Sequence, residues 1–241
     1  MISRWHISFS GAAALVVICT LPIVAATVSG RVELRDSRDA AVVKSHNYSG
    51  VVVWLKPLVP ASAAPGHAHM VQSNKRFSPH ILAVPVGTRV DFPNLDPIFH
   101  NAFSNFDGQL FDVGLYPPGG SRSVKFERPG IVRVFCNIHP MMSAVIVVVD
   151  APLFAMSGKD GAFQIANVPP GEYQLRVFHE RATEETLDKL GRRVSISNGE
   201  YTIPPISISE SGYLMTPHKN KFGREYPPTV DDAITYPGGK K

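Results

Sequence analysis

The chain has 241 residues, enough for one large or two small domains, and its 44% hydrophobic and 18% charged residues exclude a largely disordered polypeptide. Its formal net charge of +4 at pH 7 is modest, and its basic residues are scattered along the sequence. A nucleic-acid-binding protein would concentrate such residues on one segment or face, so the charge pattern gives no support to that class.

The first 26 residues differ in character from the rest of the chain. A basic residue precedes the apolar stretch GAAALVVICTLPIVAA, whose small final residues suit signal peptidase. We predict that residues 1–26 are a signal peptide and that the mature protein lies in the periplasm. An uncleaved anchor helix is the alternative, whereas Ile18 before Cys19 argues against lipoprotein processing. After cleavage, no remaining segment is long and apolar enough to span a bilayer.

The mature chain is predicted to be all-β. Short runs rich in Val, Ile, Phe and Tyr recur between clusters of Gly, Pro, Asn and Asp, as in VSGRVEL, GVVVWLKP, TRVDFPN, IVRVFC, SAVIVVVD and GEYQLRVF. Polar and apolar residues alternate over 123–126 and 173–177, which is typical of half-buried strands. The only helix we expect is a short one over residues 182–190, ended by Gly191.

Two stretches are expected to lack regular structure. Residues 59–70 (VPASAAPGHAHM) are rich in Pro, Ala and Gly, and we interpret them as a linker or long loop. Within that stretch His67, His69 and Met70 suggest a second copper site, with a solvated loop as the alternative. The tail from about Thr216 is too rich in Pro, Gly and charge to form a strand.

Cleavage of the signal peptide removes Cys19 and leaves Cys136 as the only cysteine. A lone cysteine in an oxidising compartment cannot form an internal disulfide, so it is a buried inert thiol, a reactive thiol or a metal ligand. Cys136 precedes His139 by three residues and Met142 by six, in a segment flanked by two apolar runs. A tight loop between two strands would therefore present a thiol, an imidazole and a thioether together.

These residue types match the ligands of a copper ion that cycles between Cu(I) and Cu(II). Two imidazoles and a thiolate suit both oxidation states, and a weak axial thioether tunes the potential. The second imidazole must come from another loop, and His100 in DFPNLDPIFHNAFSNF is the candidate. The predicted metal ligands are thus His100, Cys136, His139 and Met142, with Met141 as a rival axial ligand that the spacing disfavours.

Residues from about 66 to 150 resemble a cupredoxin, the plastocyanin and azurin family of blue copper proteins. FSPHILAVPVGTRVDFPN is similar to the second and third strands of that family, and RPGIVRVFCNIHPMM to its ligand loop, with the short spacing of amicyanin. The resemblance implies a Greek-key β-sandwich, one type 1 copper ion on the same four ligands, and a bracing role for Asn101.

Other kinds of site fit the sequence less well. Structural zinc sites use several cysteines or histidines and rarely a thioether. A multicopper oxidase needs repeated H-x-H pairs, and the chain has one, His67 and His69. No G-x-S-x-G, HExxH or phosphate-binding loop occurs, so we expect no enzymatic activity. We also expect His80 to be structural, and His179 and Glu180 to make surface polar contacts.

A second module surrounds this region in the sequence. MSGKDGAFQIANVPPGEYQLRVFHE (156–180) resembles part of a carboxypeptidase regulatory-like domain, a small transthyretin-like β-sandwich that is usually not catalytic. We predict that residues 27–58 and 151–210 form one sandwich, with the cupredoxin domain (59–150) inserted between them and a tail over 211–241. In the alternative, residues 27–58 extend the cupredoxin instead.

The sequence thus predicts a periplasmic blue copper protein that carries out one-electron transfer. Its partner would be another redox protein, such as a cytochrome or a dehydrogenase, and we expect neither a nucleic-acid partner nor a membrane span after signal cleavage. Similar exported proteins are often labelled methylamine-utilisation proteins, although nothing in this chain points to an amine dehydrogenase. The alternatives are a non-redox envelope module that binds carbohydrate or protein, with copper as staple or cargo, and a copper-delivery protein.

Overall fold

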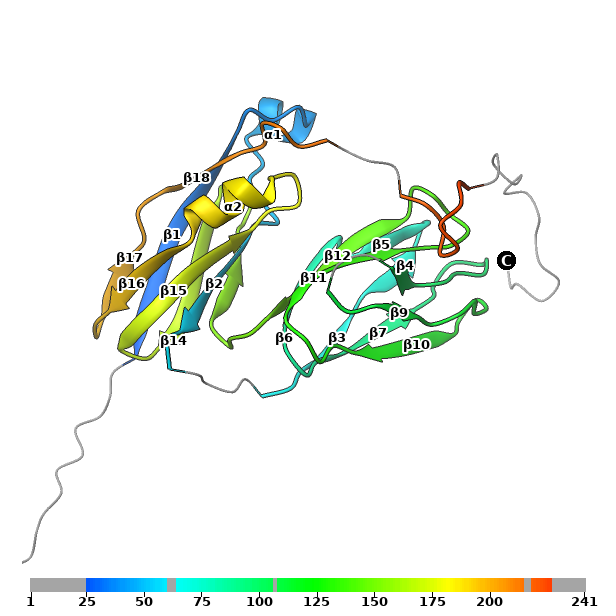
Figure 1. The fold of residues 1–241 in the computed structure, drawn as a ribbon, viewed down its shortest axis with the longest axis horizontal. Coiled ribbons are helices and arrows are strands. Elements are labelled where there is room, and N and C mark those ends of the chain that lie inside the picture. The colour runs from blue at the N-terminus through cyan, green and yellow to red at the C-terminus, as the bar shows by residue number, and fades with distance from the viewer. Residues whose placement is uncertain (1–24, 60–63, 106–107, 215–217, 227–241) are drawn as a thin grey trace, which may run out of the picture.

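The computed structural model describes residues 25–59, 64–105, 108–214 and 218–226 (Figure 1). All but the last two residues of the predicted signal peptide lie outside the described residues, so its cleavage and the periplasmic location stay predictions. Within the described part of the chain, no helix has the length and apolar character needed to cross a membrane.

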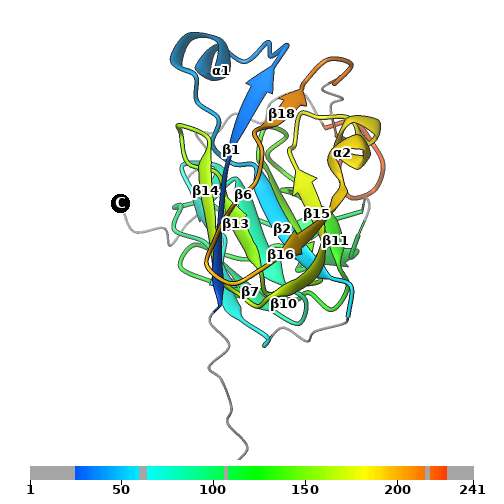
Figure 2. The same ribbon diagram turned by 90° about the vertical axis from the view of Figure 1, so that its left-hand side faces the viewer.

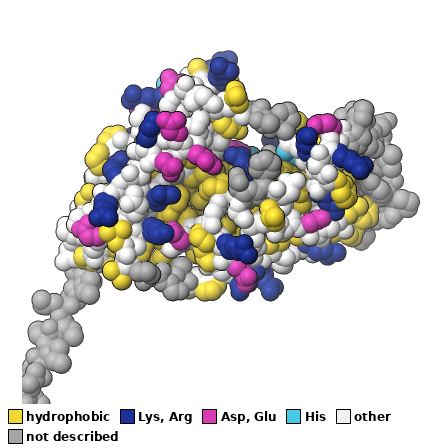
Figure 3. Space-filling view, viewed as in Figure 1, with side chains coloured by type: hydrophobic (Ala, Val, Ile, Leu, Met, Phe, Trp, Pro, Cys, Tyr) yellow, Lys and Arg dark blue, Asp and Glu magenta, His cyan; other side chains and the backbone are white. Residues whose placement is uncertain are grey.

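The predicted all-β fold is confirmed, because nearly all elements are strands and they form two β-sandwiches side by side (Figure 1). Figure 2, turned by 90°, looks onto the first sandwich with the second behind it. Lysine, arginine and acidic side chains are interspersed over the face seen in Figure 3, in agreement with the scattered charges of the sequence.

The first sandwich combines strands from both ends of the chain. Its strands are β1 (Ala26–Arg35), β2 (Val52–Pro57), β13 (Phe154–Met156), β14 (Ala162–Val168), β15 (Gly171–Phe178), β16 (Arg192–Ile196), β17 (Glu200–Thr202) and β18 (Ile206–Ser209). One sheet has the order β14-β1-β17, with β18 also paired to β1, and the other has the order β13-β2-β15-β16.

Strand pairing joins the N-terminal segment to the C-terminal one in both sheets of this sandwich. β1 pairs antiparallel with β14, and β2 pairs antiparallel with β13 and β15. In the turn before β14, Gly161 has a φ of +81°, and a Cβ there would collide with the carbonyl oxygen of Val32. The domain boundaries and the likeness to a carboxypeptidase regulatory-like domain stay predictions.

The second sandwich is formed by the central part of the chain. Its strands are β3 (His67–His69), β4 (Val71–Ser73), β5 (Arg76–Ser78), β6 (Ile81–Pro85), β7 (Arg89–Pro93), β8 (Phe103–Ser104), β9 (Phe111–Asp112), β10 (Ser121–Lys125), β11 (Gly130–Phe135) and β12 (Ser143–Val149). The sheets have the orders β10-β7-β3 and β6-β12-β11-β8-β9, and β4 and β5 form a separate hairpin. The expectation of a loop over residues 59–70 was wrong for 67–69, which pair in parallel with β7.

Strand β12 is buried on both faces, which explains its uninterrupted apolar run. Ala144, Ile146 and Val148 face the core of the second sandwich, whereas Val145 and Val147 face the first sandwich. Alternate side chains of a strand point to opposite faces, so a strand with two buried faces needs apolar residues at every position.

The contact between the sandwiches is an apolar cluster built from β2 and β15 on one side and β6 and β12 on the other. Val52 and Phe178 from the first sandwich pack against Ile81, Val145 and Val147 from the second. Burying each such valine stabilises the folded protein by about 1.5–3 kcal/mol, so the contact holds the two sandwiches together.

The two helices in the described part of the chain are both short. α2 (Glu184–Leu190) confirms the expected helix, with Thr183 as N-cap and Gly191 as C-cap. The expectation that this helix would be the only one was wrong, because α1 (Ala40–Ser45) follows an N-cap at Asp39. Six residues are too few to show a helical period in the sequence, so the cap supplied the only signal.

Polar contacts also join the sandwiches. His80, just before β6, bonds through Nε2 to the Glu180 carboxylate at 2.7 Å and through Nδ1 to the carbonyl oxygen of Ser143 at 3.1 Å. The structural role expected for His80 agrees with these contacts. The expectation of surface contacts for His179 was wrong, because it is buried and bonds to Glu210 at 2.7 Å.

The His80–Glu180 pair predicts a pH-dependent contribution to stability. The hydrogen bond that the His80 ring donates to Glu180 raises the pKa of His80 above 6.5. Burial alone would raise the pKa of Glu180, but the bond from His80 and nearby positive charge lower it below 4.5. The contribution is therefore present above about pH 4.5, where unfolded glutamate is ionised, and is lost as pH rises through the raised pKa of His80.

We expect Glu180→Gln to lower the melting temperature by about 1–2 °C at pH 5.5 and by less at pH 8.5, since half-exposed ion pairs contribute about 0.5 kcal/mol. Glu185→Gln is the matched control, because it removes a carboxylate from an exposed ion pair with a lysine, Lys189, instead of a histidine. Calorimetry measures the melting temperatures. If Glu180→Gln lowered the melting temperature equally at both pH values, the result would contradict a charged His80–Glu180 pair.

Candidate metal centre

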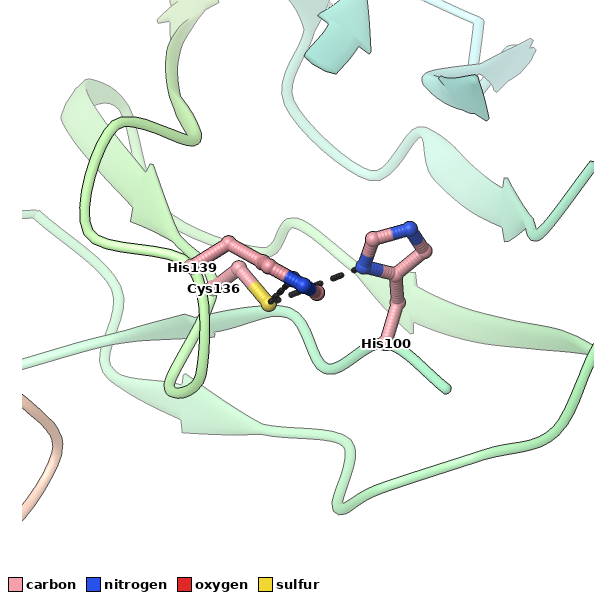
Figure 4. Close-up of side chains that lie close together, drawn as sticks. All are labelled: His100, Cys136 and His139. Atoms are coloured by element: carbon pink, nitrogen blue, oxygen red, sulfur yellow. Dashed lines mark hydrogen bonds between the residues drawn. The ribbon is translucent and has the colours of Figure 1, made fainter. Parts of the chain in front are cut away.

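Three of the four predicted ligands converge at one end of the second sandwich (Figure 4). The Sγ atom of Cys136 lies 3.5 Å from Nδ1 of His139 and 3.8 Å from Nδ1 of His100. The two imidazole ring centroids are 4.8 Å apart. His100 comes from the loop after β7 and the other two from the loop after β11, so the fold joins segments that are 36 residues apart.

Backbone hydrogen bonds hold the loop over residues 136–142 in a tight turn. The Cys136 N–H donates to the Met142 carbonyl oxygen at 3.1 Å, and the Met142 N–H donates to the His139 carbonyl oxygen at 3.0 Å. The paired strands β11 and β12 run directly into this turn. The Met142 side chain is fully buried in the same apolar cluster as Cys136, whereas Met141 is 90% exposed. Of the two methionines, Met142 is therefore the one whose side chain lies on the side of the thiol.

His100 is fully buried, and its ring is oriented by an acidic residue. Its Nε2–H donates to Oδ2 of Asp96 at 2.7 Å, so the Nδ1 lone pair is directed toward Cys136. Burial lowers the pKa of His100, although the bond that its ring donates to Asp96 acts in the opposite direction. The imidazole is therefore neutral near pH 7, which is the form that binds a metal ion.

The carboxylate of Asp96 is itself held by the backbone. The N–H groups of Asn74 and Lys75 donate to it at 2.6 and 2.8 Å. Burial alone would raise the pKa of Asp96, but these bonds and the bond from His100 lower it, so the group is ionised. Asp96 was not predicted from the sequence, where its signal was an acidic residue four positions before His100 in a largely apolar segment.

The thiol of Cys136 lies in an apolar environment. Burial raises its pKa, while the backbone N–H groups of Ile138, Asn101 and His139 act in the opposite direction. These three N–H groups direct partial positive charge toward the sulfur. They would stabilise a thiolate once a metal cation replaced the thiol proton.

Asn101 links the two loops, the role that the resemblance implied. Its Oδ1 accepts from the N–H of Asn137 at 3.3 Å, and its Nδ2 donates to Asp112 Oδ1 at 2.8 Å and to the Gly114 carbonyl oxygen at 3.0 Å. Because the side chain is almost fully buried, these bonds fix the separation between the loop after β7 and the loop after β11.

The C-terminal strap, residues 218–226, covers one side of the loop after β11. The His218 ring stacks on Phe135 with centroids 4.0 Å apart, and its Nε2–H donates to the Pro140 carbonyl oxygen at 2.7 Å. The hydroxyl of Tyr226 donates to the Cys136 carbonyl oxygen at 2.8 Å. The strap forms no strand, as expected of the tail, but its packing on the centre was not foreseen.

The donor set fits copper. Metal–ligand bonds of about 2.0–2.3 Å place neighbouring donor atoms about 3–4 Å apart, and the distances from sulfur to the two nitrogens fall in this range. One thiol with two imidazoles suits Cu(I) and Cu(II), whereas structural zinc sites fill four positions with cysteine and histidine. Among the described residues, no further histidine or cysteine joins His100, Cys136 and His139 in this cluster.

Comparisons with solved structures find copper proteins over part of the chain. The purple cupredoxin from Nitrosopumilus maritimus is 28% identical over 34% of this chain and 99% of its own, with a TM-score of 0.32. A copper-containing nitrite reductase from Thermus scotoductus SA-01 is 28% identical over 39% of this chain and 24% of its own, with a TM-score of 0.34. A reduced Cu(I) form of an amicyanin variant is 20% identical over 40% of this chain and 98% of its own, with a TM-score of 0.33.

Each of these three structures matches less than half of this chain. A scan of protein-family models and a search of curated proteins gave no match.

We expect Asp96→Ala to destabilise the protein and to weaken copper binding. The change leaves the His100 ring and two backbone N–H groups without their acceptor, which costs about 2–4 kcal/mol of unfolding free energy. Loss of the bond that orients a ligand lowers metal affinity about 10- to 100-fold. Denaturant unfolding and copper titration measure the two effects.

Asp188→Ala, at an exposed carboxylate on α2, is the control and should change stability by less than about 0.5 kcal/mol. Unchanged stability and copper affinity in Asp96→Ala would show that Asp96 does not orient His100.

Proposed function

We propose that this protein is a copper-binding electron carrier with a type 1 centre held by His100, Cys136, His139 and Met142. The observation that carries the proposal is the approach of one buried thiol to two imidazole Nδ1 atoms at 3.5 and 3.8 Å. Copper bound by such a set supplies reversible one-electron chemistry.

The surroundings of these residues suit electron transfer better than catalysis on a substrate. His100, Cys136 and Met142 are fully buried, so bulk water does not reach them. The loops that carry them are fixed by hydrogen bonds that Asp96 and Asn101 accept and by the paired strands β11 and β12. A donor set that cannot rearrange keeps the reorganisation accompanying electron transfer small.

His139 offers the route to a partner, because it is the partly exposed member of the three clustered donors. Beside it in the loop, Ile138 is 41% and Met141 is 90% exposed. Exposed apolar side chains around a partly exposed ligand suit brief docking to another redox protein, a cytochrome or a dehydrogenase, through a small interface. The predicted periplasmic location would place the protein among such partners.

Copper loading of the mature protein tests the proposal. We expect an intense blue or purple colour from the thiolate–Cu(II) bond, with a matching EPR signal, and one reversible electron per protein in voltammetry. Cys136→Ser should abolish the colour, because a serine hydroxyl cannot replace the thiolate. A colourless wild-type protein, or copper fixed in one oxidation state, would favour a structural or cargo role for the metal.

The role of Met142 has a test of its own. Met142→Leu should keep the colour but raise the reduction potential, because the change removes a weak axial donor that stabilises Cu(II). Met141→Leu is the matched control, since that side chain is exposed, and its potential should stay at the wild-type value. Equal potentials for all three proteins would exclude Met142 as a ligand.

A further inference from the structure

A second cluster of metal-binding side chains lies on the outer face of the sheet β10-β7-β3. His67 and His69 are two residues apart on β3, so their side chains share one face of the strand. The parallel pairing of β3 with β7 places Asp91 opposite His69. Met70 points to the other face and is fully buried, so it cannot join the histidines as the sequence suggested.

The donor atoms of this cluster already lie close together. Nε2 of His67 is 2.7 Å from Oδ2 of Asp91, and Nδ1 of His69 is 3.8 Å from the same oxygen. The two imidazole ring centroids are 4.9 Å apart, and all three residues offer a donor atom within 4.8 Å of the others. Metal–ligand bonds of about 2.0–2.2 Å need donors about 3 Å apart, so small side-chain rotations suffice.

The carboxylate is oriented from its other side. The hydroxyl of Ser123, the neighbour of Asp91 on β10, donates to Oδ1 at 2.6 Å. This bond is the main cause that lowers the pKa of Asp91, and it leaves Oδ2 facing both histidines. A hydrogen bond that fixes the free oxygen of a ligating carboxylate is a common feature of metal sites.

We propose that His67, His69 and Asp91 bind a divalent transition-metal ion at the surface, with Cu²⁺ bound more tightly than Zn²⁺. Two imidazoles and one carboxylate suit either ion, and the general order of stability of such complexes favours Cu²⁺. The histidine side chains are 55% and 58% exposed, so water completes the coordination and the ion exchanges readily.

Neighbouring charges limit the affinity of this surface site. Arg89 pairs with His67 in the strand register, and Lys125 pairs with Arg89, so two cations share this face with the histidines. The positive charge of Lys125 is partly compensated by the Glu127 carboxylate, whose Oε1 lies 3.1 Å from Nζ of Lys125. The surface site therefore binds copper more weakly than the buried thiol centre, so copper fills the buried centre first and the surface site second.

Copper titration of untagged mature protein, followed by calorimetry and EPR, tests this site. Wild type should bind two equivalents, the second with the signal of copper bound by nitrogen and oxygen ligands. H67Q/H69Q should lose the second equivalent, or bind it at least tenfold more weakly, and keep the visible absorption of the thiol centre. His46→Gln, at an exposed histidine of the first sandwich, is the matched control and should bind both equivalents.

Cys136→Ser separates this proposal from the proposed function, because it should lose the visible absorption and keep the surface equivalent. If the thiol centre binds no copper, wild type would take up one equivalent and H67Q/H69Q none, which would still support the surface site. Unchanged stoichiometry and affinity in H67Q/H69Q would overturn it.

Discussion

The candidate centre depends on holding two imidazoles against a thiol inside an apolar core. Polar groups are costly to bury unless each has a partner, and here the partners come from the surrounding chain. Asp96 accepts from His100, and backbone N–H groups are directed at the Cys136 sulfur. The Cys136 sulfur lies within hydrogen-bonding distance of Nδ1 of both imidazoles, and a metal cation that replaced the thiol proton would lie between these three donor atoms. The positions of these side chains are therefore those of a preformed metal site.

The rigidity of this site follows from strands that are buried on both faces. β12 carries one set of side chains into the core around Cys136 and the other set into the contact with the first sandwich. The strand that ends the ligand loop is therefore clamped between two apolar layers. The first sandwich thus supports the centre without contributing a predicted ligand, and the strap adds a hydrogen bond from Tyr226 to the Cys136 carbonyl oxygen.

The sequence predicted the features that depend on residue type and short spacing. The all-β fold followed from apolar runs between turn residues, and α2 followed from the segment over residues 182–190 that Gly191 ends. The approach of His100 to Cys136 followed from donor chemistry, but Asp96 did not, because its function depends on backbone groups at residues 74 and 75 that only folding brings near. β3 and the strap were also missed, since short segments without a periodic pattern gain their structure from tertiary contacts.

X-ray absorption at the copper edge, on protein loaded with one equivalent, tests the central claim most directly because it identifies the atoms bound to the metal. We expect one short bond to sulfur and two to imidazole nitrogens, with the short sulfur bond absent in Cys136→Ser. A spectrum from nitrogen and oxygen ligands alone, identical in the two proteins, would contradict it.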